Sequence, residues 1–197
     1  MWIAVDGAVA ASAAFGDPIR ADARTSIATL RSRGWRVGIV SGDAPEVVRS
    51  VAARLDLPAE ECHGGVSPEG KLALVRDALR SGRVVMAGDG VNDAAAVAAA
   101  SVGIGVHGGA EACLTNADVY LTTPGLAPLV ELTEGSARTM RLIRRNIGFS
   151  LAYNTVGVTL AVTGTISPLI AAIMMPLSSV TVVFSSWYGS SFTREQA

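Results

Sequence analysis

The feature that most constrains the fold is a long uncharged run near the C-terminus. No Asp, Glu, Lys or Arg occurs in residues 146–193, and the motif "TISPL" divides the run into segments 146–165 and 168–188. Each segment is about 20 residues long, and a helix of that length spans roughly 30 Å, the thickness of a hydrocarbon core. We therefore expect two membrane-spanning helices joined as an antiparallel hairpin.

Basic residues next to this run indicate its orientation. Four arginines lie directly before the first segment: Arg138, Arg141, Arg144 and Arg145. An excess of arginine in short flanking segments marks the cytoplasmic side of a membrane. We expect an integral protein of the inner or plasma membrane, in contact with membrane lipid, whose residues 1–137 are cytoplasmic.

Residues 1–137 show strand and helix patterns in alternation. The expected strands are 2–6, 9–15, 35–40, 83–88, 101–106 and 118–122. The expected helices begin behind Asp17 (closing at Gly34), behind Asp43, behind Ser67, at 93 and at about Gly125, the last running on into the membrane. Such alternation indicates a parallel sheet covered by helices on both faces, a Rossmann-like α/β fold.

Two loops follow expected strands directly: "SGD" at 41–43 and "GDGVND" at 88–93. Ligands of parallel sheets bind at the carboxyl ends of strands. The carboxylate of Asp89 is suited to a hard cation such as Mg²⁺, and the glycines beside it let the backbone approach a phosphate.

Single residues near these loops allow two interpretations each. Asn92 and Asp93 either serve the site or cap the next helix. Ser41 either binds a phosphoryl oxygen with the following amides or belongs to a plain turn. Lys71 is the only lysine of the chain, and it either neutralises a phosphate or is an ordinary solvated side chain.

A hydroxyl, a lysine and a magnesium-binding carboxylate together suit phosphoryl transfer, but the nucleophile is missing. Asp6 in "VDGAVAA" is the only early aspartate after an expected strand, and no acid or base partner follows it. We interpret Asp6 as part of a hairpin turn.

Four motifs in order resemble a known family: "FGDPIR", "VSGD", "SPEGK" and "GDGVNDAAAV". They are similar to segments of the P-type ATPases, which belong to the haloacid dehalogenase superfamily. The resemblance implies that residues 1–137 are part of a phosphorylation domain that works with ATP and Mg²⁺. It also implies site roles for Asp89 and Asp93 at the magnesium ion, Asn92 in closing the site, Ser41 and Asp43 beside the phosphoryl group, and Lys71 in neutralising it.

The uncharged run also resembles one branch of that family. Tyr153 and Asn154 match the YN of the penultimate span in copper-class heavy-metal pumps, and Met175 and Ser179 match the MxxxS of the last span. With Asn146 they form the expected path of the transported ion, and a thioether is a soft ligand suited to Cu(I). The alternative from the residues alone is packing by methionine and helix contact by serine.

Several motifs of an intact pump do not occur in this sequence, namely DKTGT with the phosphorylated aspartate, TGE and CPC. The function expected is the C-terminal part of an ATP-driven heavy-metal transporter, most simply for copper(I) export, inactive without an N-terminal pump portion as its partner. The alternative is a membrane-tethered, non-catalytic module that binds Mg²⁺ and phosphate or a metal. A net charge of −1 and a pI of about 6.1 argue against a nucleic-acid partner.

Overall fold

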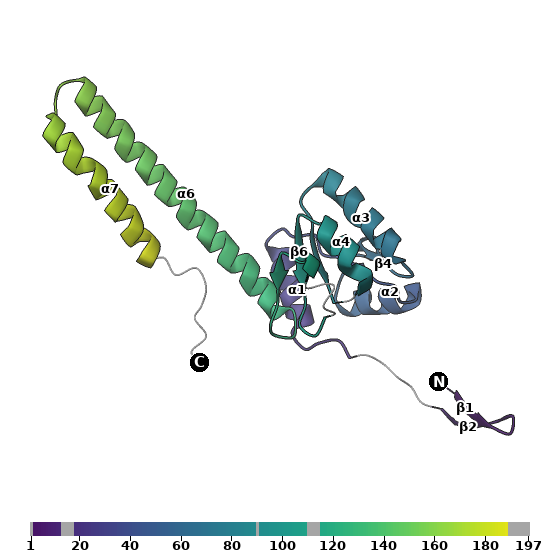
Figure 1. Cartoon of the computed structure of the whole chain (residues 1–197). Coiled ribbons are helices and arrows are strands. Elements are labelled where there is room, and N and C mark those ends of the chain that lie inside the picture. The colour runs from purple at the N-terminus through teal and green to yellow at the C-terminus, as the bar shows by residue number, and fades with distance from the viewer. Residues whose placement is uncertain (1, 13–17, 90, 110–114, 189–197) are drawn as a thin grey trace. The chain divides into compact units, whose positions relative to one another are not determined.

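The computed structural model describes residues 2–12, 18–89, 91–109 and 115–188. The chain divides into two compact units, Met1–Pro128 and Leu129–Ala197. The first contains all the strands, and the second is a helical hairpin (Figure 1).

The chain starts with two antiparallel strands, β1 (Trp2–Val5) and β2 (Ala8–Ser12). Asp6 and Gly7 join them with φ angles of 50° and 79°. Positive φ at both central residues is typical of the two-residue turns that suit the twist of a hairpin. The predicted turn at Asp6 is confirmed, whereas residues 13–17, with the remainder of the second predicted strand and Asp17, lie outside the described part.

The first helix, α1 (Ala23–Ser32), begins five residues later than the predicted start at Pro18, behind Asp17. Its N-cap is Asp22, whose carbonyl accepts the hydrogen bond from the amide of Ser26 at 2.9 Å. The helix ends as predicted before Gly34, which has a φ of 86°. Its buried face packs into the core of the unit, together with α2 (Pro45–Arg54) and the residues behind it: Ala23, Ile27, Ala52, Leu55 and Leu57.

A short parallel pair lies beside these helices. β3 (Ile39–Val40) is the last part of the strand expected at 35–40, and it pairs with β4 (Cys62–His63), which the sequence did not predict. The 3₁₀ turn η1 (Ala59–Glu61) leads into β4. A side chain at Gly38 would come far too close to the backbone oxygen of Glu61, which explains the glycine.

The other strands form a three-stranded parallel sheet in the order β5–β6–β7. They are β5 (Val85–Gly88), β6 (Val102–Gly105) and β7 (Val119–Tyr120). α3 (Pro68–Ser81) precedes β5, and the turn η2 (Val91–Asp93) and α4 (Ala94–Ala99) connect β5 to β6. The predicted cap at Ser67 is confirmed, because its hydroxyl accepts a hydrogen bond from the amide of Gly70 at 3.1 Å.

The α/β fold with parallel strands is confirmed, but the parallel strands do not form one continuous sheet. Among the described strands, β3 pairs with β4 alone and β5 pairs with β6 alone. Each therefore keeps one edge whose backbone N–H and C=O groups have no strand partner.

The second unit consists of two antiparallel helices, α6 (Ala127–Val162) and α7 (Pro168–Tyr188), of which α6 starts just before the unit (Figure 1). The helical hairpin predicted at 146–188 is confirmed as secondary structure. The predicted membrane spans are not confirmed: within the described residues, none of the helices meets the length and hydropathy needed to cross a membrane.

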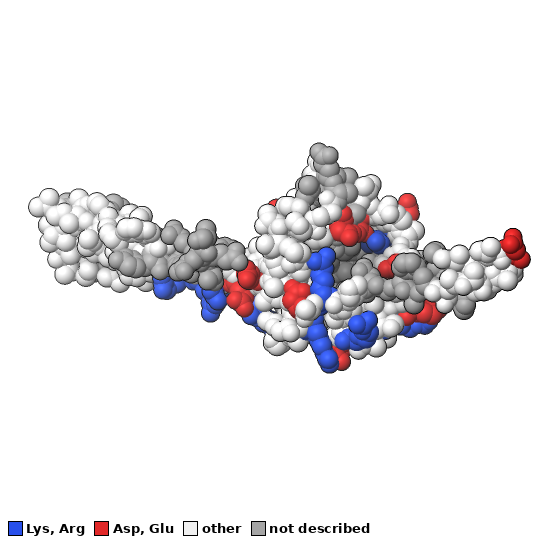
Figure 2. Space-filling view, turned by 90° about the horizontal axis from the view of Figure 1, so that it is seen from below, with Lys and Arg blue, Asp and Glu red and all other residues white. Residues whose placement is uncertain are grey.

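The surface of the hairpin is nonetheless apolar over much of its length. Exposed side chains include Leu151, Val158, Val162, Leu169 and Val183. Figure 2 shows one face of the hairpin, with no charged side chain at the end where α6 connects to α7 and with basic side chains on the part of α6 nearer its start.

Candidate functional site

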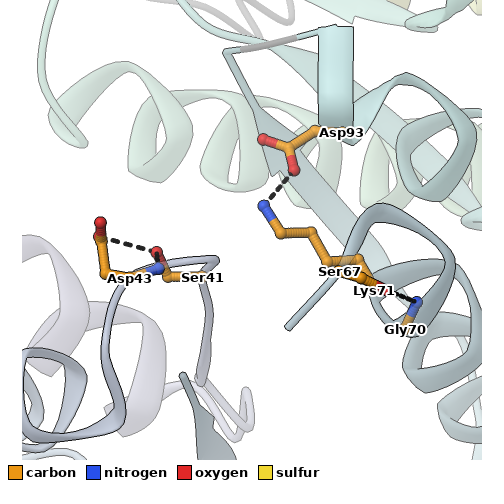
Figure 3. A network of polar contacts seen from close by, with 6 residues as sticks. All are labelled: Ser41, Asp43, Ser67, Gly70, Lys71 and Asp93. Atoms are coloured by element: carbon orange, nitrogen blue, oxygen red, sulfur yellow. Dashed lines mark hydrogen bonds and ion pairs between the residues drawn. The ribbon is translucent and has the colours of Figure 1, made fainter. Parts of the chain in front are cut away.

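A buried ion pair of the first unit joins Lys71 to Asp93 (Figure 3). The Nζ atom of Lys71 lies 2.6 Å from Oδ1 of Asp93, and each residue is only 9% exposed. The cap at Ser67 fixes the start of α3 and so places Lys71 on its first turn. Because each charge has lost most of its water, each residue depends on the other as its counter-ion.

A glycine at the end of β5 allows this contact. A Cβ atom added to Gly88 would lie 2.7 Å from Cβ of Asp93, closer than carbon atoms tolerate. Only glycine therefore lets η2 fold back so that Asp93 packs on the strand end. Asp93 is the N-cap residue of α4, but its side chain makes no capping hydrogen bond, so the carboxylate serves Lys71 instead.

The loop after β3 contains a second polar pair, Ser41 and Asp43 (Figure 3). The hydroxyl of Ser41 donates to Oδ2 of Asp43 at 2.8 Å and accepts from the Asp43 amide at 3.2 Å. The backbone of this loop is held by the segment after β4, through bonds from Ser41 N to His63 O and from Val66 N to Ser41 O. Helix α2 begins at Pro45 behind Ala44, one residue later than predicted, because the Asp43 side chain bonds within its own loop.

Ser41 and Asp43 follow the end of β3 and Asp93 follows the end of β5, as the sequence predicted, whereas Lys71 lies on the first turn of α3. No hydrogen bond or ion pair between the six drawn residues joins one pair to the other (Figure 3). Ser41 offers a hydroxyl, and Lys71 offers a compact positive charge. This combination suits an anionic group such as a phosphoryl group.

The other two residues with polar side chains in the "GDGVND" loop, Asp89 and Asn92, are exposed. In the described part of the chain, no three His, Cys, Asp or Glu residues lie close enough to hold a metal ion. Mg²⁺ binds proteins through one or two carboxylates and keeps several waters, so Asp89 fits as a single ligand that needs further oxygen ligands from elsewhere. Asp93 is already paired with Lys71.

Two of the predicted ion-path residues link the helices of the hairpin. The Tyr153 hydroxyl donates to the carbonyl of Met174 at 2.9 Å. Asn146 donates to the Ser186 hydroxyl and accepts from the Ser185 hydroxyl, both at 2.9 Å. The polar groups of these two residues therefore hold α6 against α7.

The remaining predicted path residues do not join them. Asn154 and Ser179 are exposed on the hairpin, and the Met175 side chain lies outside the described part. The buried or half-buried residues among the described side chains of α7 include Met174 and Ser178, each one position before a predicted residue, and also Val182 and Ser185. These residues recur every three or four positions and so lie on one face of α7. The small and polar residues of the sequence did not show whether this face contains Ser178 or its neighbour Ser179.

Two carboxyl groups of the first unit have a pKa below the usual range. For Asp22 the largest cause is a hydrogen bond from the amide of Ala127, opposed by burial and reinforced by the amide of Leu126. For Glu69 the causes are hydrogen bonds from its own amide and from Ser67, which lower its pKa. Nothing in the sequence indicated that Asp22 contacts residues 104 and 105 positions away.

Comparison with known proteins agrees with this geometry. The family model of haloacid dehalogenase-like hydrolases matches residues 3–101. The chain is 38% identical over 191 residues to a copper-transporting P-type ATPase of Rhizobium leguminosarum bv. viciae, covering 93% of this chain and 22% of the relative. It is also 38% identical over 189 residues to a manganese-exporting P-type ATPase of Mycobacterium leprae (strain TN), covering 94% of this chain and 26% of the relative.

A solved structure is similar to most of the chain. A zinc-transporting PIB-type ATPase in the E2.Pi state superposes with a TM-score of 0.80 and 32% identity, over 86% of this chain and 28% of that one. The chain thus spans about a quarter of the length of the heavy-metal P-type ATPases that it matches. Its matching family model, parallel strands and strand-end loops establish that the chain belongs to the haloacid dehalogenase-like hydrolases.

Proposed function

We propose that the chain is the part of an ATP-driven heavy-metal transporter that contains half of the phosphorylation site and two helices of the transport domain. The observation that carries this proposal is the buried Lys71–Asp93 pair at the end of β5. A buried lysine beside strand-end loops matches a site that binds a phosphoryl group by charge. The names of the relatives support heavy-metal transport as the function of the whole protein.

Each strand-end residue has a proposed task at this site. Lys71 neutralises the negative charge of the phosphoryl group, and Asp93 keeps the lysine in position. Ser41 binds a phosphoryl oxygen, oriented by Asp43. Asp89 holds Mg²⁺, which when bound supplies charge neutralisation to the phosphoryl oxygens, and Asn92 closes the loop over the site.

The reactive carboxylate comes from outside this sequence in our proposal. The unpaired edges of β3 and β5 support this, because a parallel strand between them would join the two short sheets into one. An aspartate at the carboxyl end of such a strand would lie at the same edge of the sheet as the loops after β3 and β5. The chain alone therefore does not hydrolyse ATP in our proposal, because covalent catalysis requires the nucleophile.

The hairpin is proposed to be part of the membrane-embedded ion path. Its uncharged length and exposed apolar side chains suit contact with lipid. Asn146 and Tyr153 fix the two helices to each other, and Asn154, Met175 and Ser179 are proposed as further residues of the ion path. Copper(I) is the proposed cargo, because a thioether ligand favours a soft cation.

The experiment uses native membranes that contain the chain, incubated with ATP labelled at the γ-phosphate and then precipitated with an antibody to residues 44–60. We expect an acid-stable phosphoprotein whose labelling rises with Cu(I) more than with Zn²⁺ or Mn²⁺. Lys71→Ala abolishes the labelling, and Arg76→Ala on the exposed side of α3 leaves it unchanged. Absence of labelled protein contradicts the proposal, and Mg²⁺ binding without labelling identifies the non-catalytic module instead.

Membrane insertion is tested separately with the same membranes. We expect the chain to remain in the pellet after alkaline carbonate extraction and to leave it in detergent. Release by carbonate alone would show that the hairpin is not embedded in lipid.

A further inference from the structure

The side chain of Asp22 caps a helix other than its own. Asp22 is the N-cap residue of α1, yet its side chain makes no capping hydrogen bond there. Its Oδ2 atom instead accepts hydrogen bonds from the amides of Leu126 at 2.6 Å and Ala127 at 2.8 Å. These are the amides at the start of α6, which no turn of that helix can satisfy. Asp22 therefore caps α6 from 104 residues away in sequence.

The residue before the capped turn is matched to this contact. Gly125 has a φ of 105°, a conformation that other residues rarely adopt. A Cβ atom at this position would also come too close to the Asp22 carboxylate. Both the backbone angle and the space thus require glycine at residue 125 when Asp22 binds the amides.

Apolar packing supports the same contact. Leu126 packs against the core cluster, which contains Ala23 and Ile27 from the buried face of α1. The carboxylate and the leucine therefore hold the beginning of α6 to one helix of the first unit.

Helix α6 continues without a break from this turn to the residues of the hairpin. Its 36 residues include Asn146 and Tyr153, which bond to α7. A continuous helix carries a rotation or shift at one end to its other end, because its backbone hydrogen bonds resist bending. The attachment at Asp22 is the place where the first turn of α6 is bound to the start of α1.

We propose that Asp22, together with Gly125, is the positioning residue that couples the phosphorylation unit to the ion-path helices by fixing the first turn of α6 to α1. The coupling part of this inference rests on the function proposed above. The attachment itself does not, and it is tested on the chain without ATP.

The test is hydrogen–deuterium exchange of the purified 197-residue chain in detergent micelles. Asp22→Ala is expected to raise the exchange rate of the amides at Leu126 and Ala127 by about tenfold or more, because a bond to a charged acceptor is lost. Asp22→Asn, which keeps one acceptor oxygen, gives a smaller increase. Gly125→Ala gives an increase like that of Asp22→Ala although the carboxylate is retained.

Two controls separate this effect from general loss of stability. Asp77→Ala removes an exposed carboxylate of α3 that pairs with Arg80, and it leaves exchange at the start of α6 unchanged. Amides of β6 keep their wild-type exchange in every variant. Unchanged exchange at Leu126 and Ala127 in Asp22→Ala, or an equal rise throughout the first unit, overturns the attachment.

Coupling is then read in the phosphorylation assay on native membranes. Asp22→Ala is expected to keep ATP-dependent labelling but to lose most of its stimulation by the metal ion, and Asp22→Asn recovers part of that stimulation. Full stimulation in Asp22→Ala overturns the coupling. Failure of the wild type to label refutes the proposed function and with it the coupling, and the exchange result still decides the attachment.

Discussion

Lys71 and Asp93 form an ion pair of 2.6 Å between side chains that are only 11% and 12% exposed. Twenty-two residues separate them in sequence, and a helix cap at Ser67 and a glycine at residue 88 bring them together. The other ion pairs described in the chain have at least one partner that is much more exposed, as in Arg80–Asp77 at 82% and 76%. The Lys71–Asp93 pair is therefore the one whose disruption is expected to affect the fold as well as the function.

Removal of one partner of this pair should destabilise the first unit. Lys71→Ala leaves the Asp93 carboxylate buried without a counter-ion, and a loss of about 3–5 kcal/mol in the free energy of unfolding is expected. Urea unfolding of the purified chain, followed by circular dichroism, measures this loss. Arg80→Ala is the matched control, because its exposed pair contributes about 0–1 kcal/mol.

The double variant separates loss of the lysine from loss of the pair. Lys71→Met with Asp93→Leu replaces both charges by apolar groups and should recover most of the stability, while phosphorylation stays absent. A double variant as unstable as Lys71→Ala would mean that apolar side chains at these two positions do not replace the contacts of the ion pair.

The features that the sequence predicted correctly depend on neighbouring residues. The cap at Ser67, the end of α1 before Gly34 and the turn at Asp6 each follow from the residue type and its place beside a periodic segment. Lys71 and Asp93 were both recognised as candidates, but the sequence did not show that they bond to each other.

The features that were missed depend on contacts between distant segments. The predicted N-cap of α1 was Asp17, whereas the observed N-cap is Asp22, whose side chain binds the amides at the start of α6. The two-residue strand β4 is too short to show an alternating pattern. On α7, burial of Ser178 instead of Ser179 depends on the rotation of the helix against its neighbour, which apolar spacing does not determine to one residue.

The close approach at Gly88 can be tested with a single methyl group. Gly88→Ala places a Cβ atom 2.7 Å from Asp93 and should displace η2, with a destabilisation of about 1–3 kcal/mol. Gly82→Ala is the control, since nothing lies within 4 Å of its added Cβ atom. Equal unfolding midpoints for the two variants would show that η2 adapts without cost.

The unpaired edges of β3 and β5 predict an order of protection from hydrogen exchange. β6 pairs on both sides and should exchange most slowly, whereas β3 and β5 pair on one side in the described part and should exchange faster. Hydrogen exchange of the amides in the three strands, measured on the isolated chain and on the chain in native membranes, tests this order. Equal protection of all three strands in the isolated chain would contradict open edges.

The bond from Tyr153 to the Met174 carbonyl predicts a modest effect on the hairpin. Tyr153→Phe keeps the ring but loses the donor, and a loss of about 0.5–1.5 kcal/mol in hairpin stability is expected. Thermal unfolding in detergent, compared with Tyr120→Phe at an exposed position of β7, measures it. An unchanged melting temperature in Tyr153→Phe would mean that water replaces the bond.

The attachment of α6 should depend on pH through Asp22. The amide of Ala127 contributes most to lowering the pKa of this carboxyl group, burial opposes the shift, and the amide of Leu126 adds to it, so the folded pKa lies below the ordinary value of 3.8. A carboxyl group with a lowered folded pKa stabilises the folded state above its unfolded pKa, and that contribution is lost as the pH falls through the folded pKa. The difference in unfolding free energy between wild type and Asp22→Asn should therefore be constant from neutral pH down to about 5 and shrink below about 4. Urea titrations from pH 3 to 7 measure that difference, and the Ala127 amide resonance reports the carboxyl pKa independently. A difference that grows as the pH falls would show that the carboxylate does not stabilise the start of α6.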